Sequence, residues 1–257
     1  EVLEAAGAEQ ADMIVAVTLH DEVNMVACQV AHSLFNVPTK IARIRSQSYL
    51  QKHYLDLFSR DHMPIDVIIS PEIEVGDVIL RRVALPGASD VVLFAQEKIA
   101  MVAIDCDENC PVIDTPLSQL SELFPDLRAT VVGVWRNGEM FAPRSSDQIK
   151  LGDLAYVIAE RGQIRRTLSI FGKERPEASR IVIAGGGNIG LYLARRIEES
   201  MPGARVKVIE ASREKAIRMA DQLKRTVVLH GSALDEQMLS EAGIGNSDMM
   251  VAITNDD

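Results

Sequence analysis

The chain contains few of the residues that characterise disulfide-rich or membrane-spanning proteins. Its 257 residues include only three cysteines, and aromatic residues make up 4%. Three cysteines are too few, and odd in number, for a disulfide framework, and they favour a reducing compartment. The longest apolar runs have the length of a β-strand, which is too short to span a bilayer. The sequence therefore predicts a globular protein that folds without disulfides.

Positive charge is also scarce. The chain has 27 Lys and Arg against 37 Asp and Glu, which gives a formal net charge of −10. No stretch is enriched in basic residues, so we expect no nucleic-acid partner. Hydrophobic residues make up 47% of the chain, enough for a sizeable core. The segment from Cys106 to Cys110 has no second pair of ligands, so we interpret it as an acidic surface turn rather than a metal site.

The end of the chain repeats its beginning. When Leu3–Asp21 is set over Leu239–Asp257, nine of nineteen positions are identical, whereas about one match is expected by chance. Both copies contain the pattern Asp-Met-x-Val-Ala-x-Thr. We therefore expect two copies of one domain, with the chain as an internal fragment that begins inside the first copy and ends inside the second.

A glycine-rich loop in the second copy predicts a dinucleotide site. It follows a buried strand over Arg180–Ala184 and precedes a helix over Leu191–Ser200 and a second strand over Val206–Ile209. The first glycine of the pattern allows a tight turn, the second lets a pyrophosphate approach, and the third lets the helix pack on the strand. The helix N-terminus offers free N–H groups to the phosphates. The predicted loop residues are Gly185, Gly186, Gly187, Asn188, Ile189 and Gly190.

An acidic residue, Glu210, ends the second predicted strand. A carboxylate at this place accepts hydrogen bonds from the ribose hydroxyls of the adenosine and repels a 2′-phosphate, which favours NAD over NADP. Arg213 and Lys215 follow closely and weaken that exclusion. The alternative interpretation is a degenerate Rossmann loop that no longer binds a dinucleotide.

The second copy continues with a third strand over Thr226–Leu229, a short helix over Leu234–Ala242 and a fourth strand over Asp248–Thr254. In a doubly wound sheet the first and fourth strands flank the ligand cleft, so residues that end the fourth strand lie beside the glycine loop. We interpret His230 as a loop residue near the adenosine rather than a catalytic base. Further cofactor-binding candidates at the strand ends are Gly231, Ser232, Thr254 and Asn255.

The first copy supplies the later elements of the same fold. We expect helices over Glu22–Phe35 and Ser48–Leu57, and a fifth and sixth strand over Lys40–Ile44 and Asp66–Ile69. The repeat places Thr18 and Leu19 at the positions that match Thr254 and Asn255. Arg43 lies on the fifth strand among apolar neighbours, and a buried Arg requires an anion: either a phosphate or carboxylate of the ligand, or a structural ion pair.

Between the copies lies a segment of different composition. It begins with a connecting helix over Ile73–Arg82, interrupted by Gly76, and changes character after Pro86-Gly87. Asn137-Gly138 predicts a hairpin turn, because both residues tolerate positive φ. The module contains no cluster of residues arranged for catalysis. Its predicted strands are Asp90–Gln96, Lys98–Ile104, Ala129–Trp135, Met140–Ala142 and Leu154–Ala159, and its predicted helix is Gln163–Phe171.

The predicted fold is therefore α/β, with Rossmann-type doubly wound parallel sheets flanking a small α+β domain. Residues 1–86 form the C-terminal half of a first Rossmann-type domain with its connecting helix. Residues 87–175 form the small domain, and residues 176–257 form the N-terminal part of a second Rossmann-type domain.

These motifs resemble the TrkA family, the cytosolic regulatory subunits of bacterial Trk potassium uptake systems. That family consists of two tandem regulator-of-K⁺-conductance units, each a Rossmann-type domain followed by a small regulatory C-terminal domain. The resemblance covers essentially the whole chain. One departure is that the glycine loop of the first copy is not in this chain. The matching segments are Ala6–Thr18, Asn24–Phe35, Ile41–Arg45, Ile183–Arg196 and Val251–Asp257.

The resemblance implies binding of NAD(H), with ATP or ADP as a second candidate. It also implies a homotetrameric ring at the cytosolic face of the inner membrane, docked on a potassium-translocating subunit. By position, Gly185–Ile189 and Glu210 would hold the dinucleotide in the second copy, and Thr18, Leu19 and Arg43 would contribute in the first. We expect a non-catalytic ligand sensor; the alternative is an NAD-dependent dehydrogenase with the same fold.

Overall fold

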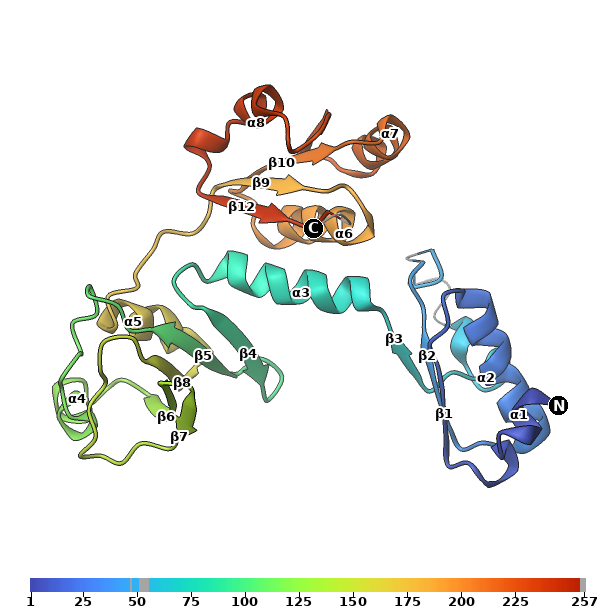
Figure 1. Cartoon of the computed structure of the whole chain (residues 1–257), viewed down its shortest axis with the longest axis horizontal. Helices are drawn as coiled ribbons and strands as arrows, with labels where there is room; N and C mark the ends of the chain where they lie inside the picture. The colour runs from blue at the N-terminus through green and yellow to red at the C-terminus, as the bar shows by residue number, and fades with distance from the viewer. Residues whose placement is uncertain (47, 51–55, 255–257) are drawn as a thin grey trace. The chain divides into compact units, whose positions relative to one another are not determined.

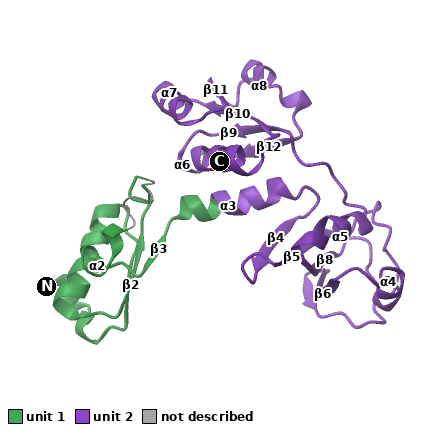
Figure 2. Ribbon diagram, turned by 180° about the vertical axis from the view of Figure 1, so that it is seen from behind, with its two compact units in different colours: residues 1–75 green, residues 76–257 purple. Residues whose placement is uncertain are grey.

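The computed structural model describes residues 1–46, 48–50 and 56–254, which form two compact units, Glu1–Val75 and Gly76–Asp257 (Figure 2). The first unit contains one sheet and the second contains two. The predicted helix over Ser48–Leu57 lies partly outside the described residues, and Asn255 lies wholly outside them. None of the helices in the described ranges is long and apolar enough to cross a membrane.

A three-stranded parallel sheet forms the first unit, in the order β1-β2-β3 (Figure 1). The apolar stripe of α2, which includes Met25 and Cys28, packs against Ala16 and Ala42 of the sheet. The two predicted strands and the first predicted helix of this copy are confirmed within a residue or two. The elements are α1 (Val2–Ala5), η1 (Ala8–Gln10), β1 (Met13–Ala16), α2 (Asp21–Phe35), β2 (Thr39–Arg43) and β3 (Val67–Ile69).

The buried cation of this sheet is Lys40. Its Nζ lies 2.8 Å from Oδ2 of Asp66 and donates to the carbonyl oxygens of Val37 and Pro38. The Asp66 carboxylate also accepts the backbone N–H of Lys40, at 2.7 Å. These contacts join the start of β2 to the segment that leads into β3 and compensate the cost of burying the charge.

A five-stranded antiparallel sheet begins the second unit, in the order β4-β5-β8-β6-β7. One face packs against α5 and the segment that contains α4. The predicted hairpin is confirmed: Asn137 and Gly138 have φ of 52° and 88°. The elements are β4 (Asp90–Phe94), β5 (Ile99–Asp105), α4 (Leu117–Leu123), β6 (Ala129–Arg136), β7 (Glu139–Phe141), β8 (Leu154–Glu160), η3 (Arg161–Gln163) and α5 (Ile164–Ile170).

A bidentate ion pair ties β6 to the turn before β8. Nε and Nη2 of Arg136 donate to the two carboxylate oxygens of Asp153, at 2.7 and 2.6 Å. Asp153 is buried and also accepts the backbone N–H of Lys150. Burial alone would raise the pKa of Asp153, but the hydrogen bonds from Arg136 and Lys150 outweigh it and lower that pKa.

A four-stranded parallel sheet completes the second unit, in the order β11-β10-β9-β12. Ile181 and Ile183 of β9 pack on the face covered by α6, whereas Val182 packs on the opposite face against α8. This continuous apolar strand is typical of a sheet covered on both sides. The elements are β9 (Arg180–Ala184), α6 (Asn188–Ser200), β10 (Arg205–Glu210), α7 (Arg213–Gln222), β11 (Val227–His230), α8 (Glu236–Ala242), η4 (Ile244–Asn246) and β12 (Met249–Ala252).

The sequence repeat is also a structural repeat. In each copy a helix is followed within two residues by a left-handed glycine, Gly7 with φ of 81° and Gly243 with φ of 78°. A single turn of 3-10 helix and a four-residue strand follow in both, in the same register. The part of the fold duplicated at the two ends is therefore the fourth strand of the Rossmann order, together with the helix and the 3-10 turn that precede it.

One prediction about the connecting helix was wrong. Helix α3 (Pro71–Ala84) runs without interruption through Gly76. A Cβ at Gly76 would collide with the ring of Tyr192 on α6, whose hydroxyl donates to Oδ1 of Asp77 at 2.8 Å. Gly76 is thus a contact point between two helices, and Ile79, Leu80 and Val83 extend that contact along α3.

Gly76→Ala provides a test of this helix contact. Alanine improves helix propensity by about 1 kcal/mol, but overpacking against Tyr192 costs about 1–3 kcal/mol. We therefore expect a lower free energy of unfolding in urea. In a Tyr192→Ala background the same substitution should be stabilising. Equal effects in both backgrounds would show that the two helices do not depend on this contact.

The Asp153 carboxylate predicts an acid-sensitive contribution to stability. Because its folded pKa is lowered, the contribution is present above the unfolded pKa of about 3.9 and is lost as the pH falls towards the folded value. We expect Asp153→Asn to cost about 3 kcal/mol at pH 7 and to flatten the pH dependence below pH 4. Urea unfolding at several pH values measures both effects. The matched control is Asp126→Asn at an exposed carboxylate, and an equal loss in both variants would contradict the role of the ion pair.

Candidate dinucleotide site

The candidate site lies at the carboxyl ends of β9 and β12, which are neighbours in the sheet. The loop from Gly185 to Gly187 leaves β9 and enters α6 directly. Ile253, just after β12, donates its N–H to the carbonyl of Ala184 and so holds the end of the fourth strand against this loop. The site therefore occupies the point of a doubly wound sheet where ligands bind.

Two of the glycines are required by the backbone that surrounds them. Gly185 has φ of 112°, and a Cβ there would collide with the carbonyl oxygen of Ile253. A Cβ at Gly190 would collide with the carbonyl oxygen of Gly185. The first glycine thus lets the loop pass β12, and the last lets α6 pack onto the loop.

Gly187 has a different environment. A Cβ built on it has no neighbour within 4 Å, so the backbone there faces open space. It is the N-cap residue of α6, and no side chain caps this end of the helix. Because the first N–H groups of a helix have no intrahelical partner, they are available to an anion. The open space and the free donors together fit a pyrophosphate.

Glu210 is buried, with 8% of its surface exposed, and its carboxylate is fixed by the backbone. Its Oε2 accepts the N–H of Gly186 at 2.7 Å, and its Oε1 accepts the N–H of Ser212 at 2.7 Å. A Cβ at Gly186 would lie 2.9 Å from this carboxylate, so the middle glycine makes room for the acid. Each oxygen retains a lone pair for a ribose hydroxyl. Arg213 and Lys215 are both exposed.

The candidate residues after β11 form the turn that leads into α8. A Cβ at Gly231 would collide with Met238 of α8, and Gly231 donates its N–H to the carbonyl of Glu210, at 3.0 Å. The hydroxyl of Ser232 accepts the N–H of Leu234 at 3.2 Å. Gly231 and Ser232 therefore stabilise the turn that leads into α8. His230 is exposed at the end of the strand.

Thr254 lies beside the glycine loop, as expected from the strand order. Its backbone nitrogen is 3.2 Å from the position that a Cβ on Gly185 would occupy. Its first-copy counterpart, Thr18, shows how such a residue is held. The Thr18 hydroxyl and N–H both donate to Oδ1 of Asn24, at 2.7 and 2.8 Å.

Asn24 is a residue that the sequence analysis missed. It is fully buried on α2, and its Nδ2 donates to the carbonyl oxygens of Thr18 and Arg43, at 3.2 and 2.9 Å. The side chain therefore joins the carboxyl ends of β1 and β2. The available signal was an amide on the apolar stripe of an amphipathic helix, because such a group requires hydrogen-bond partners when buried.

The other first-copy candidates are Arg43, which was predicted to be buried, and Leu19. Arg43 is half-buried rather than buried, because the alternation along β2 turns Lys40 and Ala42 towards α2 instead. Among the described residues Arg43 forms no ion pair, and its Nε is buried without a hydrogen-bond partner. Leu19 is 74% exposed. Arg43 thus retains a donor for an anion, whereas Leu19 offers only apolar surface.

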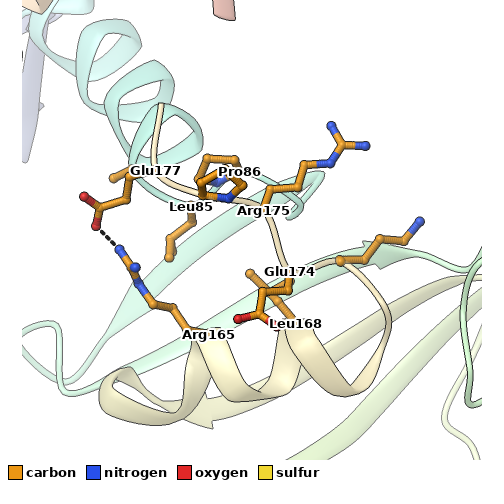
Figure 3. Close-up of a pocket in the computed structure, with 10 residues that line it drawn as sticks. Leu85, Pro86, Arg165, Leu168, Glu174, Arg175 and Glu177 are labelled. Carbon is orange, nitrogen blue, oxygen red and sulfur yellow. Dashed lines mark hydrogen bonds and ion pairs between the residues drawn. The ribbon is translucent and has the colours of Figure 1, made fainter. Parts of the chain in front are cut away.

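A separate concavity of about 330 Å³ lies where the end of α3, α5 and the linker to β9 meet (Figure 3). Arg165 on its wall is paired with Glu177, and Glu174 accepts a hydrogen bond from Ser169. Its charges are thus largely satisfied within the wall, and we do not assign a ligand to it. No cluster of three or more metal-ligating side chains occurs in the described part of the chain.

Comparison with known families identifies both kinds of domain. The TrkA-N domain model matches residues 1–71 and 181–257, and the TrkA-C domain model matches residues 101–172. The two TrkA-N matches correspond to the two parallel sheets, and the TrkA-C match corresponds to the five-stranded sheet.

Several curated proteins are similar along the whole chain. The Trk system potassium uptake protein TrkA of Azorhizobium caulinodans is 60% identical over 257 residues, which is 100% of this chain and 56% of that protein. The protein of the same name from Halomonas elongata is 41% identical over 256 residues, 100% of this chain and 55% of that protein. The chain thus spans about half the length of these relatives.

Solved structures share the fold. The crystal structure of the GsuK RCK domain superposes with a TM-score of 0.65 at 21% identity, covering 100% of this chain and 52% of that one. The GsuK channel bound to NAD superposes with a TM-score of 0.64 at 20% identity, covering 100% of this chain and 43% of that one.

Proposed function

The chain belongs to the TrkA-N domain family, and from that premise we propose that it is a regulatory, non-catalytic part of a potassium uptake system that binds NAD(H) in its second Rossmann-type domain. Its relatives carry the name of such a system, and a channel of the same fold has been solved with NAD. The proposed partner is a potassium-translocating membrane subunit, and the proposed assembly is a homotetrameric ring at the cytosolic face of the membrane.

The observation that carries the NAD proposal is the paired geometry of Gly187 and Glu210. One presents open space and free N–H groups for a pyrophosphate, and the other holds a buried carboxylate where the ribose hydroxyls of the adenosine would lie. The carboxylate is held in place before the ligand arrives, so binding does not have to order it. A 2′-phosphate would meet the same negative charge, which favours NAD over NADP.

Helix α6 provides a route from the ligand to the rest of the protein. Its N-terminus forms the phosphate site, and Tyr192, one turn further on, contacts Gly76 and Asp77 of α3. Burial and the hydrogen bond to Asp77 raise the pKa of Tyr192 to about 12, so it remains a neutral donor. If the ligand binds one of two alternative positions of α6 more tightly, it shifts the protein towards that position, and α3 moves with α6. A ligand with equal affinity for both positions shifts nothing.

The competing functions make different predictions. A dehydrogenase needs an acid or base next to the nicotinamide, and the sequence analysis offered His230 only as a residue near the adenosine; it is the exposed last residue of β11. An ATP or ADP sensor would use the same helix N-terminus and, because both nucleotides also contain an adenosine ribose, the same carboxylate of Glu210. Calorimetry with NADH, NAD⁺, ATP and ADP separates the ligands. Sustained oxidation of NADH with hydroxy, amino or keto acid substrates or products would refute the non-catalytic proposal.

Gly187→Ala tests the pyrophosphate position without disturbing the fold. Because the added methyl meets no protein atom within 4 Å, we expect the free energy of unfolding to change by no more than about 0.5 kcal/mol. The methyl would occupy the approach of the pyrophosphate, so NADH affinity should fall by about tenfold or more. Gly203→Ala, at a second open glycine in the turn after α6, is the matched control. Unchanged NADH affinity in Gly187→Ala would refute this placement.

Glu210→Gln tests the choice of dinucleotide. Glutamine keeps the size of the side chain and one acceptor oxygen, but it removes the charge that would oppose a 2′-phosphate. We expect the preference for NADH over NADPH to fall by about tenfold. Glu214→Gln, at an exposed carboxylate in the first turn of α7, should leave that preference unchanged. If both variants keep the wild-type ratio of the two affinities, Glu210 does not contact the ribose.

A further inference from the structure

The helices of the small five-stranded domain pack on one face of its sheet. Val91 of β4, Val102 of β5 and Val157 of β8 point to that face and form its core with residues of α4 and α5. Because side chains alternate along a strand, their neighbours point to the opposite face. We call this second face the open face. Its apolar residues are Val92, Phe94, Ile99, Met101, Ala103, Leu154, Tyr156, Ile158, Trp135 and Met140.

The strand register joins these residues into one patch. Residues opposite each other in an antiparallel pair are in contact distance, and diagonal neighbours are within reach of long side chains. A Cβ at Gly133 would lie 3.2 Å from Sδ of Met140 and 3.8 Å from Cβ of Tyr156, so both side chains lie over Gly133. The successive rows across the sheet are Phe94 and Ile99; Val92, Met101 and Ile158; Ala103, Tyr156 and Gly133; and Leu154, Trp135 and Met140.

The open face has the composition of a protein interface. It contains the single tryptophan of the chain and two of its ten methionines, and its ten apolar members include three aromatic residues. Interface cores are depleted of charge and enriched in aromatic residues and Met, and Trp is among the residues that contribute most to binding. Phe94, Trp135 and Met140 are 45%, 44% and 51% exposed.

The size of the patch is consistent with this. From the exposed fractions of its residues, the apolar area is on the order of 500 Å², as large as the largest apolar patch of a typical monomer. That is more than half of the roughly 800 Å² that each partner buries in a stable complex, and the rim would supply the rest.

The charged residues at the rim of the open face indicate which partner it binds. They are already matched within the chain. A face that binds a basic partner would leave its carboxylates free, whereas two copies of a face with a neutralised rim can meet without repulsion. The rim therefore favours a second copy of the same chain. The matched groups are Asp90 with Arg82 at 3.4 Å, Glu160 with Arg128 at 2.9 Å, Glu97 with Arg161, and Asp105 with the hydroxyl of Ser89.

We propose that the open face binds the open face of a second copy of this chain, so that two sheets pack face to face about a two-fold axis. Sheets packed in this way lie about 10 Å apart. A two-fold contact is reciprocal: a residue of one copy meets a site on the other and is met there in return. Because Ala103 and Gly133 are small, Trp135 of each copy fits over the middle row of the other. The pairing goes beyond the proposed dinucleotide site and does not depend on it.

Trp135 makes the contact measurable, because it is the only tryptophan in the chain. We expect the purified chain, without dinucleotide, to associate with rising concentration in analytical ultracentrifugation. Tryptophan emission should move to shorter wavelength and acrylamide quenching should fall along the same concentration curve, since burial of Trp135 and association are one event. Far-UV circular dichroism should stay constant across the series.

Met140→Glu tests the face and leaves Trp135 as the reporter. Because the variant would bury an unpaired carboxylate in each copy, the dissociation constant should rise about a hundredfold or more, and Trp135 should remain exposed to acrylamide. Val92→Glu, in a different row of the same face, should have the same effect, so the test does not rest on one variant. Ile217→Glu, at a residue of α7 that is 54% exposed, is the matched control and should associate like the wild type. Urea unfolding shows that each variant is folded.

Three outcomes would overturn the proposal. The first is a chain that stays monomeric throughout the concentration series. The second is association that leaves the emission and quenching of Trp135 unchanged, because the copies would then meet through another surface. The third is association of folded Met140→Glu and Val92→Glu with the affinity of the wild type.

Discussion

The close approach of three backbone segments at Gly185 and Gly190 is the constraint on which the second Rossmann-type domain depends. The loop passes β12 only because Gly185 has no side chain, and α6 packs onto the loop only because Gly190 has none. If either segment moved away, Gly186 would lose its place against Glu210 and the helix N-terminus would no longer face the open space at Gly187. The strand order, the fixed carboxylate and the free helix end thus all depend on the close approach at Gly185 and Gly190. The proposed ligand site requires all three.

This constraint also explains why α6 and α3 act as a pair. A helix held tightly at its N-terminus transmits displacement along its axis more readily than it bends, because its hydrogen bonds resist distortion. Tyr192 reaches α3 at Gly76, where the missing Cβ brings the two helices close, and the apolar residues of α3 continue the contact. A substitution that separates these helices would therefore affect coupling even if it left the proposed ligand site intact.

Much of this arrangement could be predicted from sequence because the signals are local. Continuous apolar runs predicted the parallel strands, and Asn137-Gly138 predicted the hairpin. The errors arose where a local signal was ambiguous or where the partners of a residue lie far away in the chain. Gly76 has the sequence signature of a helix breaker, but it is a contact site for Tyr192, which lies over a hundred residues away in the chain. Lys40 rather than Arg43 is the buried cation, since strand alternation decides which side chain faces α2. Asn24 was missed because its partners, Thr18 and Arg43, come together only in the folded sheet.

The duplicated and the unique parts of the chain meet at α3. Near its N-terminal end, Gly76 and Asp77 contact α6, which carries the glycine loop. Just beyond its C-terminal end, Gly87 packs on the backbone of Lys173, whose ammonium group pairs with Asp107 in the small domain. Helix α3 is therefore contacted near one end by the helix of the proposed ligand site and, just beyond the other end, by the linker to the second Rossmann-type domain. Since the proposed ligand would act on α6, a displacement of α6 would reach this linker through α3.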